Sequence, residues 1–242
     1  YQFNDISILL LESNINLDNI EKNNGMSAIH QVTILGNNTI FNLLINKNIK
    51  FNLPDYFGNT PLHYALIENN FDFAYQLIDK VDNFNISNYQ GNTPLHIALL
   101  EKNTPHDIIN NLIKNTKLNL QNNQGNTNIH LLINNNIFKF ENILKKKEIN
   151  IFINNKNGES PLFLFKSLYP SKINQFIDLI TLSYYTSLKK YPKERLIKKW
   201  EILCSKKEEN YPVKDRNKII ADCKKEIKKK ILENDRSIPY LY

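Results

Sequence analysis

Cysteine is nearly missing from this 242-residue sequence, which contains only Cys204 and Cys223. Two cysteines are too few for a disulfide framework, so we expect a protein of a reducing compartment. Long hydrophobic runs are missing too: no stretch approaches the roughly 18 apolar residues of a membrane span, and no signal peptide is recognisable. These absences predict an intracellular protein, cytoplasmic or nuclear. The sequence begins with Tyr1 rather than Met, so we expect further sequence upstream.

Motifs of catalysis and cofactor binding are absent as well. The sequence has no Gly-rich phosphate loop, no Gly-x-Ser-x-Gly turn, no His-Glu-x-x-His and no Cys-x-x-Cys. A zinc site at Cys204 and Cys223 would need ligands that the surrounding segment lacks. We therefore predict no enzymatic activity, no metal and no cofactor. Both cysteines share helical faces with apolar residues, which favours burial; a disulfide or a reactive thiol is the alternative.

Charge and asparagine divide the sequence near residue 166. Residues 1–165 contain 12 basic and 14 acidic side chains, whereas residues 166–242 contain 19 basic and 10 acidic ones. Asparagine occurs 36 times before residue 166 and four times after it. The two parts therefore differ in character, and all of the net positive charge lies in the C-terminal part.

One six-residue motif recurs five times at a nearly constant spacing, with its glycines 33, 33, 34 and 33 residues apart. It accounts for five of the six glycines and four of the five histidines. The five copies read Gly25-Met-Ser-Ala-Ile-His30, Gly58-Asn-Thr-Pro-Leu-His63, Gly91-Asn-Thr-Pro-Leu-His96, Gly125-Asn-Thr-Asn-Ile-His130 and Gly158-Glu-Ser-Pro-Leu-Phe163. A period of this length is typical of repeat proteins.

Each copy of the motif predicts a turn that leads into a helix. Glycine permits a backbone conformation that other residues resist, Thr or Ser caps the helix, and Pro is tolerated in its first turn. A short apolar helix follows, such as that of Leu62, Ala65 and Leu66, and after a polar break a second periodic run begins near Phe73. Stacking of such helix-turn-helix units would bury one continuous core.

Two of the copies, Thr60-Pro-Leu-His-Tyr-Ala65 and Thr93-Pro-Leu-His-Ile-Ala98, match the signature of the ankyrin repeat family, which the chain therefore resembles. Copies one, four and five diverge: Ser27-Ala28 replaces Thr-Pro, Asn128 replaces Pro, and Phe163 replaces His. Similar divergent arrays occur in large DNA viruses, intracellular bacteria and protists.

The resemblance implies an all-α ankyrin-repeat solenoid over residues 1–186, followed by a basic helical segment over residues 187–242. The array would consist of a partial repeat at residues 1–24 and repeats that start near residues 22, 55, 88, 122 and 155. Ile173, Phe176, Ile177 and Ile180 would belong to its last outer helix.

The resemblance also implies structural roles for the recurring polar residues. The motif histidines His30, His63, His96 and His130 are expected to form hydrogen bonds near the helix starts, rather than to bind metal. An asparagine six residues before the repeat glycine is expected to form a turn; in some ankyrin proteins it is hydroxylated instead. This position holds Asn19, Asn52, Asn85 and Asn119.

Ankyrin proteins bind partners with their hairpin tips and inner-helix face, so this surface is the predicted protein-binding site. The predicted contact residues at the tips are Tyr56, Phe57, Asn59, Tyr89, Gln90, Asn92, Asn123, Gln124 and Asn126, and those on the inner helices are Ile67, Glu68, Leu100 and Glu101. Exposed aromatic residues at the tips favour a partner contact. The alternative is that these rings pack on neighbouring hairpins.

The C-terminal segment predicts two amphipathic helices, from Leu188 to Ser205 and from about Val213 to Leu232. Their apolar stripes favour docking on the last repeat as a cap. The alternative is a patch for nucleic acid or an anionic membrane, although acidic residues interleave with its lysines. Its lysines would be Lys198, Lys199, Lys224, Lys225, Lys228 and Lys229.

Three functions remain open from the sequence. The chain is predicted to be a protein–protein interaction adaptor, in the host cell if it is viral. The alternatives are a structural component of a larger assembly such as a virion, and a nucleic-acid-associated protein that binds through its basic tail.

Overall fold

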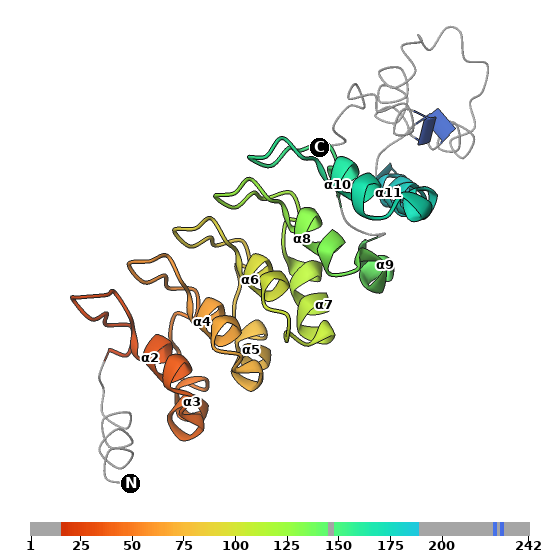
Figure 1. The fold of residues 1–242 in the computed structure, drawn as a ribbon. Coiled ribbons are helices and arrows are strands. Elements are labelled where there is room, and N and C mark those ends of the chain that lie inside the picture. The colour runs from red at the N-terminus through yellow and green to blue at the C-terminus, as the bar shows by residue number, and fades with distance from the viewer. Residues whose placement is uncertain (1–15, 145–147, 189–224, 227, 230–242) are drawn as a thin grey trace, which may run out of the picture. The chain divides into compact units, whose positions relative to one another are not determined.

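The computed structural model describes residues 16–144, 148–188, 225–226 and 228–229. These residues form helices joined by turns and hairpin loops (Figure 1). The chain divides into two compact units. The first contains Tyr1–Thr116 and Gln121–Gln124, and the second contains Lys117–Leu120 and Gly125–Tyr242. The predicted all-helical solenoid is confirmed, whereas the predicted boundary at residue 186 stays a prediction.

The first unit contains three successive helix pairs, each preceded by a hairpin (Figure 1). The inner helices α2, α4 and α6 follow the motif glycines, and α3, α5 and α7 are their outer partners. The bounds are Ala28–Leu35 for α2, Asn38–Leu44 for α3, Pro61–Ile67 for α4, Phe71–Ile78 for α5, Pro94–Leu100 for α6 and His106–Asn115 for α7.

The second unit begins its helices with the inner helix α8 (Asn128–Asn134). The outer helix of this repeat is broken into the 3₁₀ helix η1 (Ile137–Phe140) and the short α9 (Glu141–Leu144), after Asn136 at φ +59°. Next come α10 (Pro161–Leu168), η2 (Pro170–Lys172) and the long α11 (Ile173–Leu188). On α11 the side chains of Phe176, Ile177 and Ile180 are buried, which confirms the predicted last outer helix.

The core of each unit consists of the apolar residues that recur with the repeat. In the first unit Leu62, Leu66 and Leu95 are buried, and the rings of Phe41 and Phe73 stack at 3.8 Å between neighbouring outer helices. In the second unit, Phe165 stacks on Phe176 at 4.2 Å. Because neither helix of a pair can bury its apolar face alone, this packing between pairs stabilises the array.

Three of the motif histidines, His30, His63 and His130, form hydrogen bonds between consecutive repeats, in line with their expected structural role. In His63, Nδ1 accepts from the backbone N–H of Thr60 at 3.1 Å, and Nε2 lies 3.0 Å from the carbonyl oxygen of Asn92 in the next hairpin. Since an amide N–H can only donate and a carbonyl can only accept, the ring is neutral with its proton on Nε2. His30 and His130 make the same pair of contacts, to Asn59 and Glu159 respectively.

Backbone hydrogen bonds also connect the hairpins of the first unit. The backbone N–H of Tyr56 donates to Asn24, that of Tyr89 to Phe57 and that of Asn123 to Gln90, each at 2.9 Å. This contact brings each motif glycine against the following hairpin. A Cβ atom on Gly91 would lie 2.7 Å from the backbone nitrogen of Asn123, and Gly91 also has φ +74°. Glycine is therefore required twice, by its conformation and by the close approach.

Gly158 provides a matched control for that close approach. It has φ +78°, but a Cβ atom there would meet no described atom within 4 Å. We expect G158A to lower the free energy of unfolding by about 1 kcal/mol, through backbone strain alone. We expect G91A to lower it by about 3 kcal/mol, because the next hairpin must also shift. Urea denaturation measures both, and equal losses would contradict the close approach.

The neutral histidines predict a loss of stability in mild acid. Burial lowers the pKa of His63 from 6.5 to about 4, and desolvation also lowers the pKa of His30 and His130. Below about pH 6.5 these histidines therefore bind protons in the unfolded chain but stay neutral in the folded chain. The contribution of the neutral histidines to the free energy of unfolding is fully present above about pH 6.5. It declines as the pH falls towards 4, by about 3 kcal/mol for His63.

Urea denaturation at a series of pH values measures this loss. H63Q should show a shallower decline of the unfolding free energy between pH 6.5 and 4 than the wild type. H106Q removes an exposed histidine outside the motif and is the matched control. If H63Q and the wild type declined equally, the neutral buried ring would be contradicted.

Asn128 is the least favourable of the motif replacements. It occupies the first turn of α8, where repeats two, three and five have proline. Its side chain is buried, its Oδ1 has no hydrogen-bond partner among the described residues, and its Nδ2 lies 3.5 Å from the carbonyl of Lys117. A buried oxygen without a partner is destabilising.

We expect N128P to raise the free energy of unfolding by about 1 kcal/mol, because proline suits the first helical turn and the backbone of Thr127 is already extended at ψ 164°. The reciprocal variant P94N places asparagine at the same position of repeat three and should lower it. Thermal melts of both variants test the prediction. A loss of stability in N128P would show that the amide is needed.

Candidate partner-binding surface

In repeats two to five, the hairpin tip is fixed by an Asp or Asn three residues before the motif glycine. In the second repeat, Oδ1 of Asp55 accepts from the backbone N–H groups of Phe57 and Asn59 at 2.9 and 2.8 Å. Asn88 and Asn155 accept from their own hairpins in the same way, at 3.0 Å. These bonds hold the loop while the two residues before the glycine remain at its tip.

A second set of side-chain bonds joins successive hairpins. Within the first unit, Nδ2 of Asn88 donates to Oδ1 of Asn59, and Nδ2 of Asn122 donates to Oδ1 of Asn92, both at 2.9 Å. In the second unit, Asn155 donates to Asn126 at 3.0 Å. The residue after the motif glycine is thus a hydrogen-bond acceptor between repeats.

This bonding corrects part of the predicted contact surface. Asn92 was expected to be exposed at a hairpin tip, but it is 5% exposed and its amide bonds to Asn122. Asn59 and Asn126 are half-buried in the equivalent bonds. The prediction failed at Asn92 because the residue that covers it is 30 positions further along the chain.

Asp55 is an aspartate at a position where the later hairpins have asparagine, and neighbouring residues accommodate this difference. The residue after the glycine in the first repeat is Met26, whose side chain offers no amide oxygen. An aspartate at position 55 has no N–H group to satisfy, and its Oδ2 accepts from the hydroxyl of Tyr64 at 2.6 Å. Desolvation and then this bond raise the pKa of Tyr64 to about 12.

The three aromatic residues at the tips differ in exposure. Tyr56 is 48% exposed, and its ring lies over Gly25, where a Cβ atom would come within 2.4 Å of it. It therefore follows the alternative interpretation, packing on the neighbouring hairpin. Phe57 and Tyr89 are 57% and 73% exposed. The predicted tip residues Gln90, Asn123 and Gln124 are also exposed.

The inner helices add a row of aliphatic side chains to this surface. Ile67 and Leu100 were predicted, and Ile34 stands at the same position of the first repeat, 33 residues earlier. Because Ile34 lies one repeat length before Ile67, the sequence alone could have predicted that it belongs to this row. Leu100 is 47% exposed, whereas Ile34 and Ile67 are half-buried.

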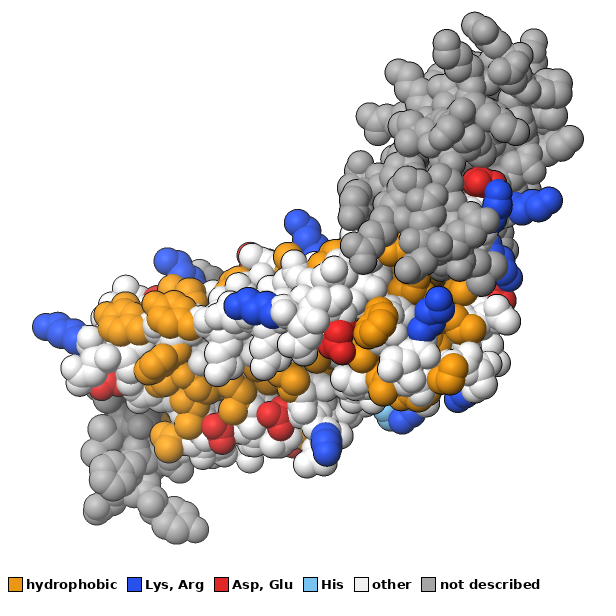
Figure 2. All heavy atoms as spheres, turned by 45° about the horizontal axis from the view of Figure 1, so that its top comes forward, with side chains coloured by type: hydrophobic (Ala, Val, Ile, Leu, Met, Phe, Trp, Pro, Cys, Tyr) orange, Lys and Arg blue, Asp and Glu red, His pale blue; other side chains and the backbone are white. Residues whose placement is uncertain are grey.

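The next position along each inner helix holds Leu35, Glu68 and Glu101 in the three repeats of the first unit. Leu35 is 77% exposed, Glu68 is exposed and Glu101 is half-buried. Figure 2 shows a band of hydrophobic side chains on one face, with acidic side chains along its lower edge.

The equivalent positions of the second unit are mostly polar. Asn134 and Asn135 end α8, and Lys156 and Asn157 form the tip of the last hairpin. Among the described residues of the second unit the large exposed apolar side chains are Phe163 and Leu168 of α10, whereas its hairpin tip and the end of α8 are polar.

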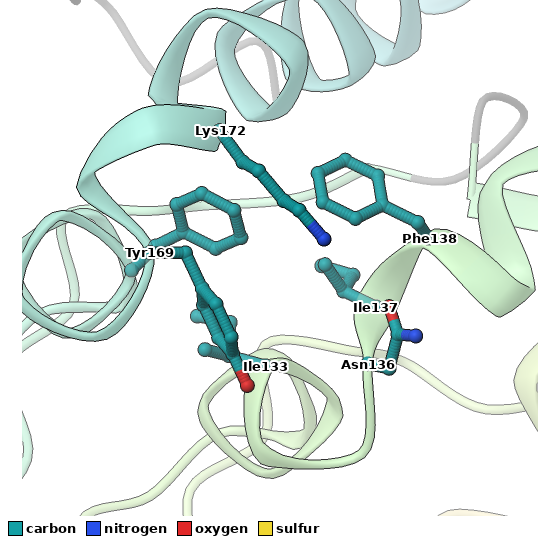
Figure 3. Close-up of a pocket in the computed structure, with 7 residues that line it drawn as sticks. Ile133, Asn136, Ile137, Phe138, Tyr169 and Lys172 are labelled. Atoms are coloured by element: carbon teal, nitrogen blue, oxygen red, sulfur yellow. The ribbon is translucent and has the colours of Figure 1, made fainter.

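A cavity of about 120 Å³ lies in the second unit, where the outer helix after α8 is broken (Figure 3). Its lining comes from Ile133 and the segment Asn136–Phe138, from Phe165 of α10, and from Tyr169 and Lys172 between α10 and α11. The amine of Lys172 points into it between Phe138 and Tyr169 (Figure 3).

Other predicted sites have the following places. Within the described ranges no group of three or more His, Cys, Asp or Glu side chains is arranged to hold a metal, and none of the helices there is long and apolar enough to cross a membrane. Lys198, Lys199, Lys224 and both cysteines lie outside the described residues. Lys225 and Lys229 are exposed, and Nζ of Lys228 forms an ion pair with Asp178 of α11 at 2.6 Å.

Comparison with known proteins supports the interpretation of the motif. Residues 2–88 and 54–116 match the family described as ankyrin repeats in three copies. Over 100 residues the chain is 36% identical to an ankyrin repeat protein of Acanthamoeba polyphaga mimivirus. That match covers 41% of this chain but only 12% of the viral protein.

Three solved structures have a similar fold. An ankyrin repeat domain from Acinetobacter baumannii is 19% identical with a TM-score of 0.60, over 76% of this chain and 93% of that one. The ankyrin repeat domain of Bcl-3, of the IkappaB family, is 17% identical with a TM-score of 0.56, over 72% and 78%. A chain from a Bdellovibrio bacteriovorus predatory endopeptidase in complex with an immunity protein is 20% identical, with a TM-score of 0.54 over 78% and 93%. At these identities the similarity shows the fold alone.

Proposed function

Because the chain belongs to the ankyrin repeat family, we propose that it acts as an adaptor that binds another protein, through the hairpin tips and inner-helix face of its first unit. The observation that carries the proposal is the exposure of Phe57, Tyr89 and Leu100 at the hairpin tips and on an inner helix of the first unit. Large apolar side chains left in water at regular positions of a rigid scaffold are typical of a partner surface.

The hydrogen bonds of the scaffold support this assignment. The buried histidines and the bonded Asn and Asp residues are engaged within and between repeats, as is Asn92. The side chains of Phe57, Tyr89 and Leu100 project from that network without being needed by it. Such a surface would bind its partner by shape and apolar contact.

Affinity capture with a double variant tests the proposed surface. We expect Y89A/L100A to reduce recovery of bound protein about tenfold or more, because aromatic and aliphatic anchors carry most of the binding energy of an interface. L43A removes a leucine that is 37% exposed on the outer helix α3 and is the matched control. Recovery by the double variant equal to that by L43A would contradict the proposed surface.

The other predicted functions remain alternatives. A structural component of an assembly would co-purify with its partners in fixed, high copy number, whereas an adaptor need not. Binding of nucleic acid would depend on the lysines of the C-terminal segment, of which Lys198, Lys199 and Lys224 lie outside the described residues. The pairing of Lys228 with Asp178 favours docking of the tail on α11 as a cap.

A further inference from the structure

The first unit combines its apolar row with a negative charge. Residues 1–116 contain eleven acidic and six basic side chains, a balance of −5. Two of the acidic residues, Glu68 and Glu101, directly follow Ile67 and Leu100 in the sequence. Neither forms an ion pair with a lysine or arginine within the parts of the chain that the structure describes.

Resting on the protein-binding function proposed above, we propose that the partner presents an amphipathic segment with an apolar stripe and lysine or arginine along one edge. The stripe packs on Ile34, Ile67 and Leu100, and the basic edge faces Glu68 and Glu101. A partner with an acidic edge would meet two carboxylates of the same sign and the negative field of the whole unit.

The exposed tip rings favour the same partner. Tyr89 is 73% exposed, so the face of its ring is open to a cation, and arginine and lysine are attracted to aromatic faces. The acidic side chains at the edge of the hydrophobic band in Figure 2 also favour a positively charged partner. Aromatic tips and carboxylates thus select positive charge by two different interactions.

The apolar row also limits the length of the segment. At the position of Ile34, Ile67 and Leu100, the next repeat has Asn134. The inferred stripe therefore spans the three repeats of the first unit, and the equivalent positions beyond it are polar.

Synthetic peptides test this partner chemistry directly. The probe is a fluorescent peptide of about 18 residues, or five helical turns, with leucine on one face and lysine on the other. A leucine/glutamate peptide tests the sign of the charge, and a glutamine/lysine peptide tests the apolar stripe. With the full chain in about 0.15 M salt, fluorescence anisotropy should show the leucine/lysine peptide binding at least about tenfold more tightly than either control.

Charge reversal provides the decisive variant. E68K/E101K should weaken the leucine/lysine peptide by about tenfold or more and strengthen the leucine/glutamate peptide. D72K/D79K makes the same change in net charge on exposed carboxylates of the outer helix α5 and its C-terminal cap, and should keep the wild-type preference. E68Q/E101Q, a milder change, should give an intermediate result if charge reversal impairs folding.

The inference would be overturned if E68K/E101K and E68Q/E101Q both kept the wild-type preference for the leucine/lysine peptide. It would also be overturned if D72K/D79K weakened binding of that peptide as much as E68K/E101K does. Failure of the proposed function would look different: recovery of bound protein by Y89A/L100A would equal that by L43A. If Y89A/L100A abolished capture of a protein while E68K/E101K kept the wild-type peptide preference, the binding surface would stand and the basic partner would be wrong.

Discussion

The array depends on the bond between a buried neutral imidazole and the backbone of the next repeat. In the first unit, His30 and His63 each receive a hydrogen bond from the start of their own helix and reach a carbonyl 29 residues further along the chain. One histidine side chain thereby stabilises the start of its own helix and also attaches the next hairpin. Burial keeps the ring uncharged, so the bond retains its direction over the neutral pH range.

The sequence was sufficient for the features that depend on residues within one repeat. A period of 33 residues, a capping Thr or Ser and an early Pro predicted the hairpins and the inner helices. The structural role of the histidines followed from the resemblance to ankyrin repeats. The broken outer helix after α8 was not predicted. The apolar residues Ile137 and Phe140 keep the helical pattern, while Asn136 adopts a left-handed conformation that composition does not reveal.

The candidate site was predictable to a lesser extent, because exposure depends on the neighbouring repeat. Tyr56 and Tyr89 occupy the same position of consecutive hairpins, yet Tyr56 covers a glycine while Tyr89 projects into solvent. Asn92 and Gln90 stand two residues apart in one tip, and only Asn92 is enclosed. Ile34, by contrast, could have been assigned from the register of Ile67 and Leu100. Pairwise contacts across repeats are the information that a single motif does not contain.

Met26 and Asp55 stand where the later interfaces have two asparagines, and they give the repeats a fixed order. At the later interfaces an asparagine amide donates to an asparagine oxygen of the preceding hairpin. At the first interface Met26 offers no amide oxygen, and Oδ2 of Asp55 accepts from the hydroxyl of Tyr64 within its own repeat. If the third repeat were transplanted behind the first, the amide of Asn88 would face a thioether, a much weaker acceptor than an amide oxygen. Exchange or duplication of whole repeats is therefore restricted at the first interface and easier at the later ones.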